Sequence, residues 1–392
     1  MKTKISNFLQ ERIEAGDFPS AVYLVAEKGE IVLHEALGYA VIEPERIEAK
    51  IDTIYDLASL TKPLVTGLLC AQLFEEGDMS LDSGIAEFLP QFNTEDKRKI
   101  TIKDLAVHTS GMIPWLPLYL TSTSLISVDD TIASKPLANS VNNLVLYSDL
   151  NFITLAFVIE RLRGFSRIDI ESGYTIIDPL ELAKTSFNPL RHNWNLNIEV
   201  NSIAASEKGN EYEKQTCIES GYLQPPAIAG GSDPEPQIRN PHSTLRTHQI
   251  WGEVHDGNAY FMGGVAGHAG LFSTAEETFK IAQQFLANYT TLLKPETCRL
   301  FRTNFTKGMN EARSIAFQLA ETKDSTAGSK MSPDSFGHLG FTGTSLWIDP
   351  VRERIFILLT NRTHNRELPF ANINSVRRRF HDLSVEFLEK NS

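Results

Sequence analysis

Ser59 and Lys62 stand three residues apart near the start of residues 54–76, a stretch typical of an amphipathic helix. On a helix this spacing makes the two side chains neighbours, with about 5–6 Å between their Cβ atoms. A serine hydroxyl becomes a strong nucleophile only when a base takes its proton, and a lysine can be that base if burial and nearby positive charge lower its pKa. The pair therefore suggests an activated serine.

The same pair also fits an ordinary helix start. Serine is a good N-terminal residue for a helix, Pro63 fits only in the first turn, and Lys62 would then be a solvated side chain. Because S-x-x-K occurs by chance in many chains, the motif alone does not establish catalysis. If it is catalytic, the N–H groups and the positive dipole end at the helix N-terminus would favour a developing oxyanion.

Tyr147 stands in a similar position, just before a second helical pattern. Residues 147–163 carry apolar side chains at helical spacing, and Ser148 or Asp149 is expected to cap the helix. A phenol next to a helix N-terminus is therefore a second candidate for chemistry, although a tyrosine in such a place is more often a packing residue.

The remaining pattern places strands toward both ends of the chain. Residues 20–27 and 31–39 are β-rich runs separated by K-G-E, which predicts an antiparallel hairpin. Further β signals lie at 336–348 and 354–360. Other helical patterns are found at residues 5–13, 101–111 (ended at Gly111), 275–286 and 374–388.

Long irregular stretches separate these elements. Residues 113–143 suggest loops and short helices, and residues 164–258 have no steady period, with a Gly/Pro-rich surface excursion at 224–241. The economical fold is α+β: an antiparallel sheet flanked by helices. We expect residues 1–75 and 259–392 to form the sheet domain and residues 76–258 a mostly helical insertion, with the active site at their interface.

Composition narrows the possible partners. The chain has 392 residues, 42% of them hydrophobic, which is enough for a real core. Its net charge of −12 disfavours nucleic acid and anionic membranes as partners, and solubility is the plainer explanation of that charge. The partner that we expect is a small-molecule substrate. The sequence leaves the oligomeric state open.

The cysteines and the N-terminus indicate a reducing compartment. Three widely spaced cysteines without C-x-x-C favour neither a disulfide framework nor a zinc ribbon, and Cys70 is expected to be buried. The N-terminal residues show no apolar signal-peptide region, and no run reaches the roughly 18 apolar residues that span a bilayer. A cytoplasmic protein is the expectation.

Taken together, the motifs resemble those of the serine β-lactamase-like hydrolases. The resemblance lies in their order over residues 18–381 and is strongest to class C β-lactamases, their esterase relatives and DD-peptidases of the penicillin-binding-protein type; residues 215–248 are the least familiar part. The motifs are P-S-A-V (19–22), S-L-T-K (59–62), L-A-V-H-T-S-G-M (105–112), Y-S-D (147–149), G-G-V-A-G-H-A-G-L-F-S-T (263–274), G-H-L-G-F-T-G-T (337–344) and S-L-W-I-D-P (345–350).

The resemblance implies roles for three residues. Ser59 would be the acylated nucleophile and Lys62 its proton acceptor or relay. Tyr147 matches the tyrosine of the family's Y-x-N element, which shuttles a proton to the leaving group. Because a phenol ordinarily titrates near pH ~10, it would need a nearby ammonium group, which Lys62 could supply.

The resemblance also implies a wall for the site. His338-Leu339-Gly340 matches the family's K-T-G triplet on an edge strand, so His338 would polarise or orient the substrate carbonyl or the tyrosine. Gly340 would let the substrate backbone approach closely, and the N–H of Phe341 would join that of Ser59 as the oxyanion hole. A surface histidine in a hairpin is the alternative.

Three departures from the family's pattern bear on the substrate. His338 is largely neutral at pH 7 and replaces a fixed positive charge, while Leu339 removes a hydroxyl that would bind a carboxylate. Asp149 replaces the amide of Y-x-N with an acid that cannot donate hydrogen bonds when ionised. These departures favour an uncharged ester or amide over an anionic antibiotic or a D-Ala-D-Ala terminus.

Other motifs give no competing chemistry. His108 and His268 are expected to hold loops by hydrogen bonds to the backbone. The glycine-rich run at 263–270 lacks the G-K-[ST] ending of a nucleotide-binding loop. H-E-x-x-H is absent, the ten histidines show no ligand spacing, and no G-x-S-x-G indicates an α/β-hydrolase. We expect no metal and no cofactor.

The sequence therefore predicts a serine hydrolase that works through an acyl-enzyme on Ser59. Carboxylesterase-type hydrolysis of a small ester or amide is favoured. The alternatives are a β-lactamase or DD-peptidase-like activity, an acyltransferase, and a non-catalytic acyl-binding sensor. The natural substrate is left open.

Overall fold

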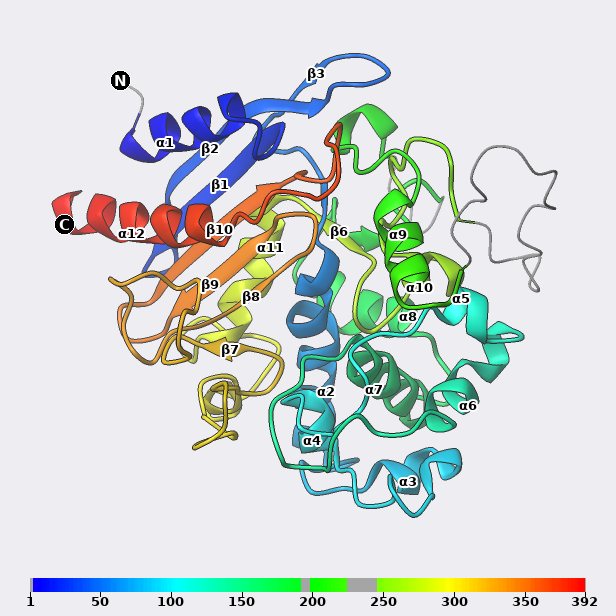
Figure 1. Ribbon diagram of the computed structural model, residues 1–392. Helices are drawn as coiled ribbons and strands as arrows, with labels where there is room; N and C mark the ends of the chain where they lie inside the picture. The colour runs from blue at the N-terminus through cyan, green and yellow to red at the C-terminus, as the bar shows by residue number, and fades with distance from the viewer. Residues whose placement is uncertain (1–2, 192–197, 224–244, 392) are drawn as a thin grey trace, which may run out of the picture.

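An antiparallel sheet of seven strands organises the computed structural model, which describes residues 3–191, 198–223 and 245–391. The strand order is β3-β2-β1-β10-β9-β8-β7 (Figure 1). The strands are β1 (Ser20–Glu27), β2 (Glu30–Val41), β3 (Ile47–Glu48), β7 (Gln318–Leu319), β8 (Phe336–Leu339), β9 (Ser345–Asp349) and β10 (Arg354–Thr360).

β1 lies between the predicted hairpin partner and a strand from the far end of the sequence. It pairs antiparallel with β2 on one side, which confirms the hairpin, and with β10 on the other, where Ala21 is opposite Thr360. Its apolar residues alternate between two cores: Tyr23 packs in one and Leu24 in the other. A strand covered on both faces reads as a continuous apolar run, which is why its bounds matched the prediction.

Helices cover both faces of the sheet. On one face lie α1 (Lys4–Glu14) and α12 (Asn374–Asn391), side by side and packed on β1 and β10 (Figure 1). On the other face α11 (Ala275–Ala282) packs against the same two strands. The expected α+β architecture is confirmed.

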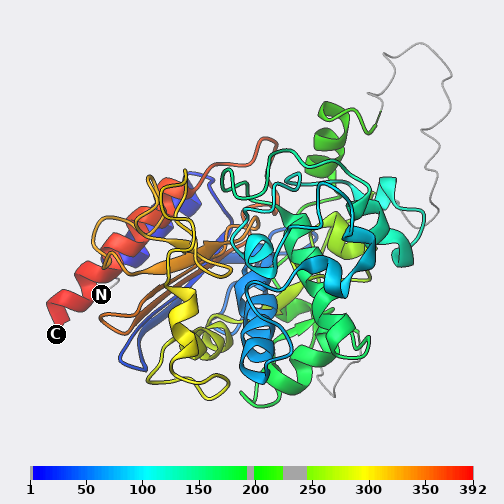
Figure 2. The same cartoon turned by 90° about the horizontal axis from the view of Figure 1, so that it is seen from below.

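The remaining helices gather beyond α11, as Figure 2 shows from below. A small second sheet, in the order β4-β6-β5, joins distant parts of the chain at their edge. Whether the two regions are separate domains with the boundaries given above stays a prediction. The elements are α2 (Leu68–Glu76), α3 (Ile85–Phe88), α4 (Ile102–Ala106), α5 (Leu118–Thr121), α6 (Val128–Ala133), α7 (Asp149–Leu162), α8 (Ile168–Ser172), α9 (Glu211–Glu219), α10 (Gly257–Phe261), β4 (Tyr55–Asp56), β5 (Ser186–Phe187) and β6 (Leu271–Ser273).

Three predicted elements differ in detail. The helix expected at 54–76 is a 3₁₀ turn (Ala58–Leu60), a π-helix (Lys62–Gly67) and only then α2. The helix expected to end at Gly111 ends at Ala106, because the left-handed His108 (φ 62°) turns the chain earlier. The β signal at 336–348 is a pair of strands, since the chain reverses between β8 and β9.

The structure tests the expected burial of Cys70 but not the expected surface excursion. Cys70 is fully buried, as expected. The surface excursion expected at 224–241 lies outside the described residues. Among the helices that the structure describes, none combines the length and the apolar character needed to cross a bilayer.

His381 on α12 gives a testable dependence of stability on pH. Complete burial lowers the pKa of this histidine to about 3. The unfolded chain binds its proton near pH ~6.5, so the stability contribution is fully present above that pH and is lost as pH falls toward 3, by about 1.4 kcal/mol per unit. Replacing His381 with glutamine should flatten this fall, and urea unfolding at pH 7, 6, 5 and 4 measures it.

Comparing the variant with the parent isolates the histidine. Glu160, whose pKa burial raises to about 7, acts in the opposite direction between pH ~4.5 and 7, because the folded form then binds the extra proton. That contribution is the same in both proteins and cancels in the difference. Equal slopes in the two proteins would contradict the prediction.

Candidate active site

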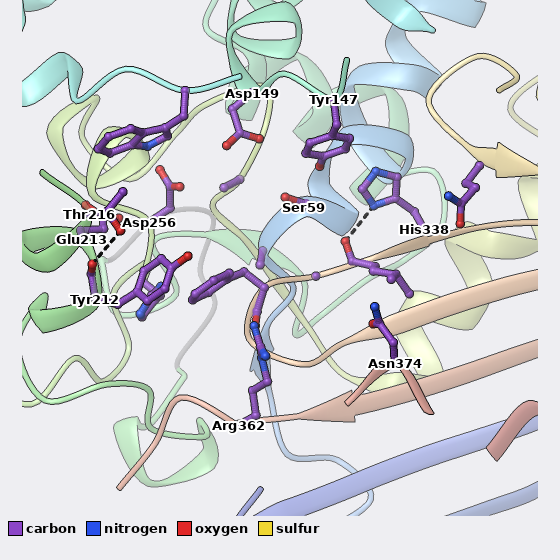
Figure 3. Close-up of a pocket in the computed structure, with 18 of the residues that line it drawn as sticks. Ser59, Tyr147, Asp149, Tyr212, Glu213, Thr216, Asp256, His338, Arg362 and Asn374 are labelled. Carbon is purple, nitrogen blue, oxygen red and sulfur yellow. Dashed lines mark hydrogen bonds between the residues drawn. The ribbon is translucent and has the colours of Figure 1, made fainter. Parts of the chain in front are cut away.

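A cavity of about 570 Å³ brings the predicted site residues together. Ser59, Tyr147 and Asp149 line it, and so do the side chains or backbone of His338, Gly340 and Phe341 on β8 and the turn after it. Figure 3 shows Tyr147 and His338 beside Ser59, with Tyr212, Glu213 and Asp256 across the cavity. Lys62 is completely buried directly behind Ser59.

A tight turn, rather than a helix cap, presents the Ser59 hydroxyl. Ala58 adopts a left-handed conformation (φ 48°), which is unfavourable for alanine, and its N–H donates to Asp56 Oδ1 at 2.8 Å. Thr61 Oγ1 donates to the Ala58 carbonyl at 2.7 Å. Ser59 makes no side-chain cap, so the alternative of an ordinary helix start with a capping serine does not fit the structure. The turn instead holds Ser59 at the cavity wall.

Lys62 is held by three acceptors. Its Nζ donates to Ser59 Oγ at 2.9 Å, to Asp149 Oδ1 at 2.7 Å and to the His268 carbonyl at 3.2 Å. An ammonium group has three donors, and these three partners use them all. The i, i+3 prediction for Ser59 and Lys62 is confirmed.

The charge state of Lys62 differs from the one that a general base needs, which is a lysine whose pKa has been lowered toward neutrality. Burial lowers its pKa, but Asp149 and Tyr147 act in the opposite direction and the net shift is upward. Lys62 is therefore an ammonium ion at neutral pH, not a lysine brought toward neutrality. In this state it donates to the Ser59 oxygen and cannot take its proton.

Tyr147 is fixed between charged and aromatic neighbours. Lys62 Nζ lies 4.9 Å from its ring centre and the Arg313 guanidinium carbon 5.5 Å from it. The centre of the His108 ring lies 4.5 Å from that of Tyr147, with the two rings tilted by 36°, and His108 Nδ1 accepts the N–H of Ser148 at 3.1 Å. His108 thus holds the loop through the backbone, as expected. Ser148 does not cap α7, because its hydroxyl donates to the Ile113 carbonyl instead.

Asp149 has a role that the sequence did not suggest. An ionised acid cannot donate the hydrogen bonds that the amide of the Y-x-N element can. In the structure, however, Asp149 acts as an acceptor for the Lys62 ammonium group. The only sequence signal was its place two residues after Tyr147.

His338 stays neutral in the site. Burial comes first among the causes that lower its pKa well below the ordinary value, followed by the charges of Lys62 and Arg313. Its Nδ1 donates to the Leu339 carbonyl at 2.8 Å, which leaves Nε2 as an acceptor with no partner among the described residues. An acceptor cannot polarise a substrate carbonyl, so of the two roles expected for His338 only orienting the tyrosine fits this tautomer.

Gly340 brings β8 close to the Ser59 turn. A Cβ atom at this position would lie 1.9 Å from Thr344 Oγ1 and 2.6 Å from the Leu57 carbonyl oxygen. The glycine was expected to admit the substrate backbone, but the structure shows that it is required for packing against residues 57–58.

We expect Gly340→Ala to push the strand away from Ser59. The alanine methyl group has no room beside the Leu57 carbonyl, so the variant should be destabilised by about 1–3 kcal/mol and its kcat/KM should fall roughly 100-fold or more. Steady-state kinetics together with thermal unfolding measure both effects. Parent-like activity would contradict the proposed arrangement.

Several residues in and near the cavity were not identified from the sequence. Arg313 is 5% exposed and its Nε has no partner among the described residues. Burial, together with the charge of Asp256, raises the pKa of Glu213 to about 7. Arg313 lies outside the named helices and strands and Glu213 lies on α9, and only the fold brings the two to the cavity.

A cluster of possible metal ligands lies beside Lys62. Ligand atoms of Asp149, Asp256 and His268 lie within 4.8 Å of one another. Asp149 already accepts from the Lys62 ammonium group, and Asp256 Oδ1 is 2.9 Å from His268 Nε2. The His268 ring therefore pairs with a carboxylate rather than with the backbone, and Lys62 is the cation that these groups surround.

Comparisons with known proteins identify the family of this chain. A family model described as Beta-lactamase matches residues 5–377. A protein of Escherichia coli K12 named "Putative D-alanyl-D-alanine carboxypeptidase" is 29% identical over 387 residues, covering 92% of this chain and 82% of its own.

Two solved structures have a similar fold. EstCE1, "a hydrolase with promiscuous acyltransferase activity", has a TM-score of 0.70 at 20% identity and covers 97% of both chains. A penicillin-binding protein homologue from Caulobacter crescentus has a TM-score of 0.67 at 17% identity, covering 98% of this chain and 96% of its own. With the family match spanning nearly all of its length, this chain belongs to the beta-lactamase family.

Proposed function

We propose that the protein is a serine hydrolase that forms an acyl-enzyme at Ser59. The observation that carries the proposal is the contact of 2.9 Å between Lys62 Nζ and Ser59 Oγ, in a cavity that Tyr147 also lines. A hydroxyl in contact with an ammonium group and beside a phenol has what acyl transfer needs: a nucleophile, a fixed charge and a proton carrier. The family to which the chain belongs supports the same chemistry.

Because Lys62 is already protonated, we assign the proton transfers in this proposal to Tyr147. Because the lysine is held as an ammonium ion by Asp149, it stabilises a negative oxygen rather than removing a proton. Tyr147 in its phenolate form would accept the Ser59 proton during attack and pass it to the leaving group. The neutral Nε2 of His338 would then accept a hydrogen bond from the protonated tyrosine or from the substrate.

Two backbone N–H groups are proposed to stabilise the oxyanion. Ser59 belongs to the 3₁₀ turn and Phe341 follows β8, and both line the cavity. A carbonyl carbon placed for attack by Ser59 Oγ would direct its oxygen between these groups. Preorganised donors of this kind typically supply about 3–4 kcal/mol each to the transition state.

An ester with an apolar acyl group is the substrate class that we favour. The cavity includes the rings of Trp115, Tyr212 and Phe341, which suit an apolar group. The triplet position carries the neutral His338 and the apolar Leu339 rather than groups that bind an anion. These features support carboxylesterase-type hydrolysis.

Arg313 supports a second candidate, a carboxypeptidase. The triplet that begins at His338 lacks the lysine that would bind an anionic substrate. The buried Arg313 guanidinium, however, lines the same cavity next to Tyr147 and carries a positive charge. Its Nη2 already donates to Glu311 Oε1 at 2.9 Å, but its Nε has no partner among the described residues and could contribute to binding a carboxylate on the leaving side. The name of the Escherichia coli relative points to the same class of substrate.

A paired labelling and substrate experiment tests the proposal. A fluorophosphonate should attach to Ser59, as mapped by mass spectrometry, and short p-nitrophenyl esters should turn over faster than nitrocefin or a peptide ending in D-Ala-D-Ala. If the adduct does not form on Ser59, the acyl-enzyme proposal is wrong. Adding alcohol acceptors shows whether transfer competes with hydrolysis.

Arg313→Gln separates the two substrate classes. For a carboxypeptidase the variant should lose roughly 10- to 100-fold on the carboxylate-bearing peptide and little on a neutral ester. For an esterase both substrates should respond alike. A peptide preferred over every ester in the parent protein would overturn the ester assignment.

A further inference from the structure

We propose that Arg377 on α12 positions and polarises the peptide group that supplies the Phe341 N–H to the oxyanion hole. This inference rests on the proposed function, because it assigns a task within the same acyl transfer. Arg377 reaches the turn that follows β8 from α12.

The contacts of Arg377 converge on one turn. Its Nη2 donates to the Gly340 carbonyl at 2.8 Å and to the Thr344 carbonyl at 2.9 Å. Its Nη1 donates to Asn374 Oδ1 at 2.9 Å, within α12. The two ends of the turn, residues 340 and 344, are thus held by a single nitrogen of one guanidinium group.

The Gly340 carbonyl and the Phe341 N–H belong to the same peptide group. In a trans peptide the C=O and N–H bonds point in opposite directions within one plane. Because Arg377 fixes the Gly340 carbonyl, the Phe341 N–H is directed away from the Arg377 guanidinium, and both Gly340 and Phe341 line the cavity. Withdrawing electron density from the oxygen also makes that N–H a stronger donor.

A second arginine holds the next peptide group. Arg362 Nε donates to the Phe341 carbonyl at 2.7 Å, and the Arg362 N–H donates to the Thr342 carbonyl at 2.9 Å. Phe341 is therefore fixed through the carbonyl before it and through its own carbonyl. Rotation of the Phe341 N–H would break at least one of these charged hydrogen bonds.

The same turn is tied to the segment that carries the nucleophile. Thr344 Oγ1 donates to the Leu57 carbonyl at 3.1 Å, and Thr342 Oγ1 donates to the Asp56 carbonyl at 2.8 Å. The Phe341 and Ser59 N–H groups thus belong to two segments whose relative position is fixed by these two hydrogen bonds. A displacement of the turn would change the distance between the two donors.

Arg377 Nη2 donates to these carbonyl groups and Nη1 donates to Asn374, whereas the buried Nε has no hydrogen-bond partner among the described residues. The side chain is 5% exposed, and among the described residues it forms no ion pair with a carboxylate. Burial, followed by the charge of Arg362, lowers the pKa of Arg377 to about 9, which leaves it charged at neutral pH. A buried guanidinium without an acid partner is costly, and here its charge acts on peptide dipoles beside the nucleophile.

Arg377 and Asn374 also line the cavity, so a competing role is direct contact with an anionic substrate. A substrate without a carboxylate distinguishes the two. A p-nitrophenyl ester with a neutral acyl group is the probe, and burst kinetics gives its acylation rate separately from KM. A boronic acid that forms a tetrahedral adduct reports on the oxyanion hole independently of turnover.

Arg377→Met, Arg377→Lys and the control Arg379→Gln form the test set. Arg379 lies two residues further on α12, with a half-exposed side chain and one long ion pair to Glu386. With the neutral ester, Arg377→Met should lower the acylation rate roughly 10- to 100-fold with KM within about two-fold, and boronate affinity should fall by the same factor. Arg377→Lys should recover part of both, and Arg379→Gln should behave as the parent.

Each outcome bears on a different claim. If the parent forms no acyl-enzyme at Ser59, the proposed function fails before any Arg377 variant is measured. If the parent is acylated and folded Arg377→Lys and Arg377→Met keep its acylation rate and boronate affinity, this inference alone is wrong. A rise in KM confined to anionic esters would also overturn it in favour of substrate contact. Should Arg377→Met fail to fold, Arg377→Lys against the parent decides.

Discussion

Ser59→Ala is expected to lower ester turnover by about 10⁴- to 10⁶-fold, the largest effect of any single change in this protein. The Ser59 hydroxyl is in contact with the Lys62 ammonium group, and in the proposed mechanism no acyl-enzyme can form without it. Initial rates with a p-nitrophenyl ester, combined with intact-mass detection of a fluorophosphonate adduct, measure the loss of turnover and of labelling.

Stability gives the control for this variant. Lys62 keeps its contacts with Asp149 and the His268 carbonyl when the Ser59 hydroxyl is removed, so the free energy of unfolding should change by no more than about 1 kcal/mol. A folded Ser59→Ala protein that still hydrolyses esters at the parent rate would show that the chemistry takes place elsewhere.

Lys62→Met is expected to have the second largest effect, on activity and stability together. Activity should fall by about 10³-fold or more, because the variant lacks the charge that stabilises an oxygen anion beside Ser59. The change also leaves Asp149 without its cation. Breaking a buried pair costs about 3–5 kcal/mol, and we expect somewhat less because the Asp149 side chain is 20% exposed and water can reach it. Burst kinetics and urea unfolding measure the two effects.

The double variant Lys62→Met/Asp149→Asn separates the two effects. Replacing the carboxylate with an amide removes the unpaired charge, so much of the lost stability should return. Activity should not return, since the ammonium group is still absent. Recovery of activity in the double variant would mean that Lys62 serves only to neutralise Asp149.

The sequence was sufficient to predict an element where its apolar pattern indicates burial directly. Ser20–Glu27 and Arg354–Thr360 are continuous apolar runs, and both are strands buried along nearly their whole length. The order of Ser59, Lys62 and Tyr147 along the chain likewise carried enough information to name residues that now lie around one cavity.

The sequence was insufficient where a residue's role depends on a distant partner. The Lys62 pKa depends on Asp149, which a local pattern cannot place beside it. Arg377 follows the apolar Val376 at the start of α12, and a helical pattern assigns such a charged residue to solvent. It is buried only because the turn at 340–344 offers two carbonyl groups there.

The position of β1 between β2 and β10 has a consequence for how the protein is made. Ala21 leaves the ribosome long before Thr360, its partner across the sheet. At ordinary elongation rates the interval is on the order of tens of seconds, during which the edge of an apolar hairpin is unpaired and prone to aggregation. The Ser59 turn is likewise synthesised well before Phe341 and Arg377, so the nascent chain carries the proposed nucleophile before the proposed oxyanion hole is complete. We therefore expect the growing polypeptide to need chaperone protection and to become reactive only when synthesis is nearly complete.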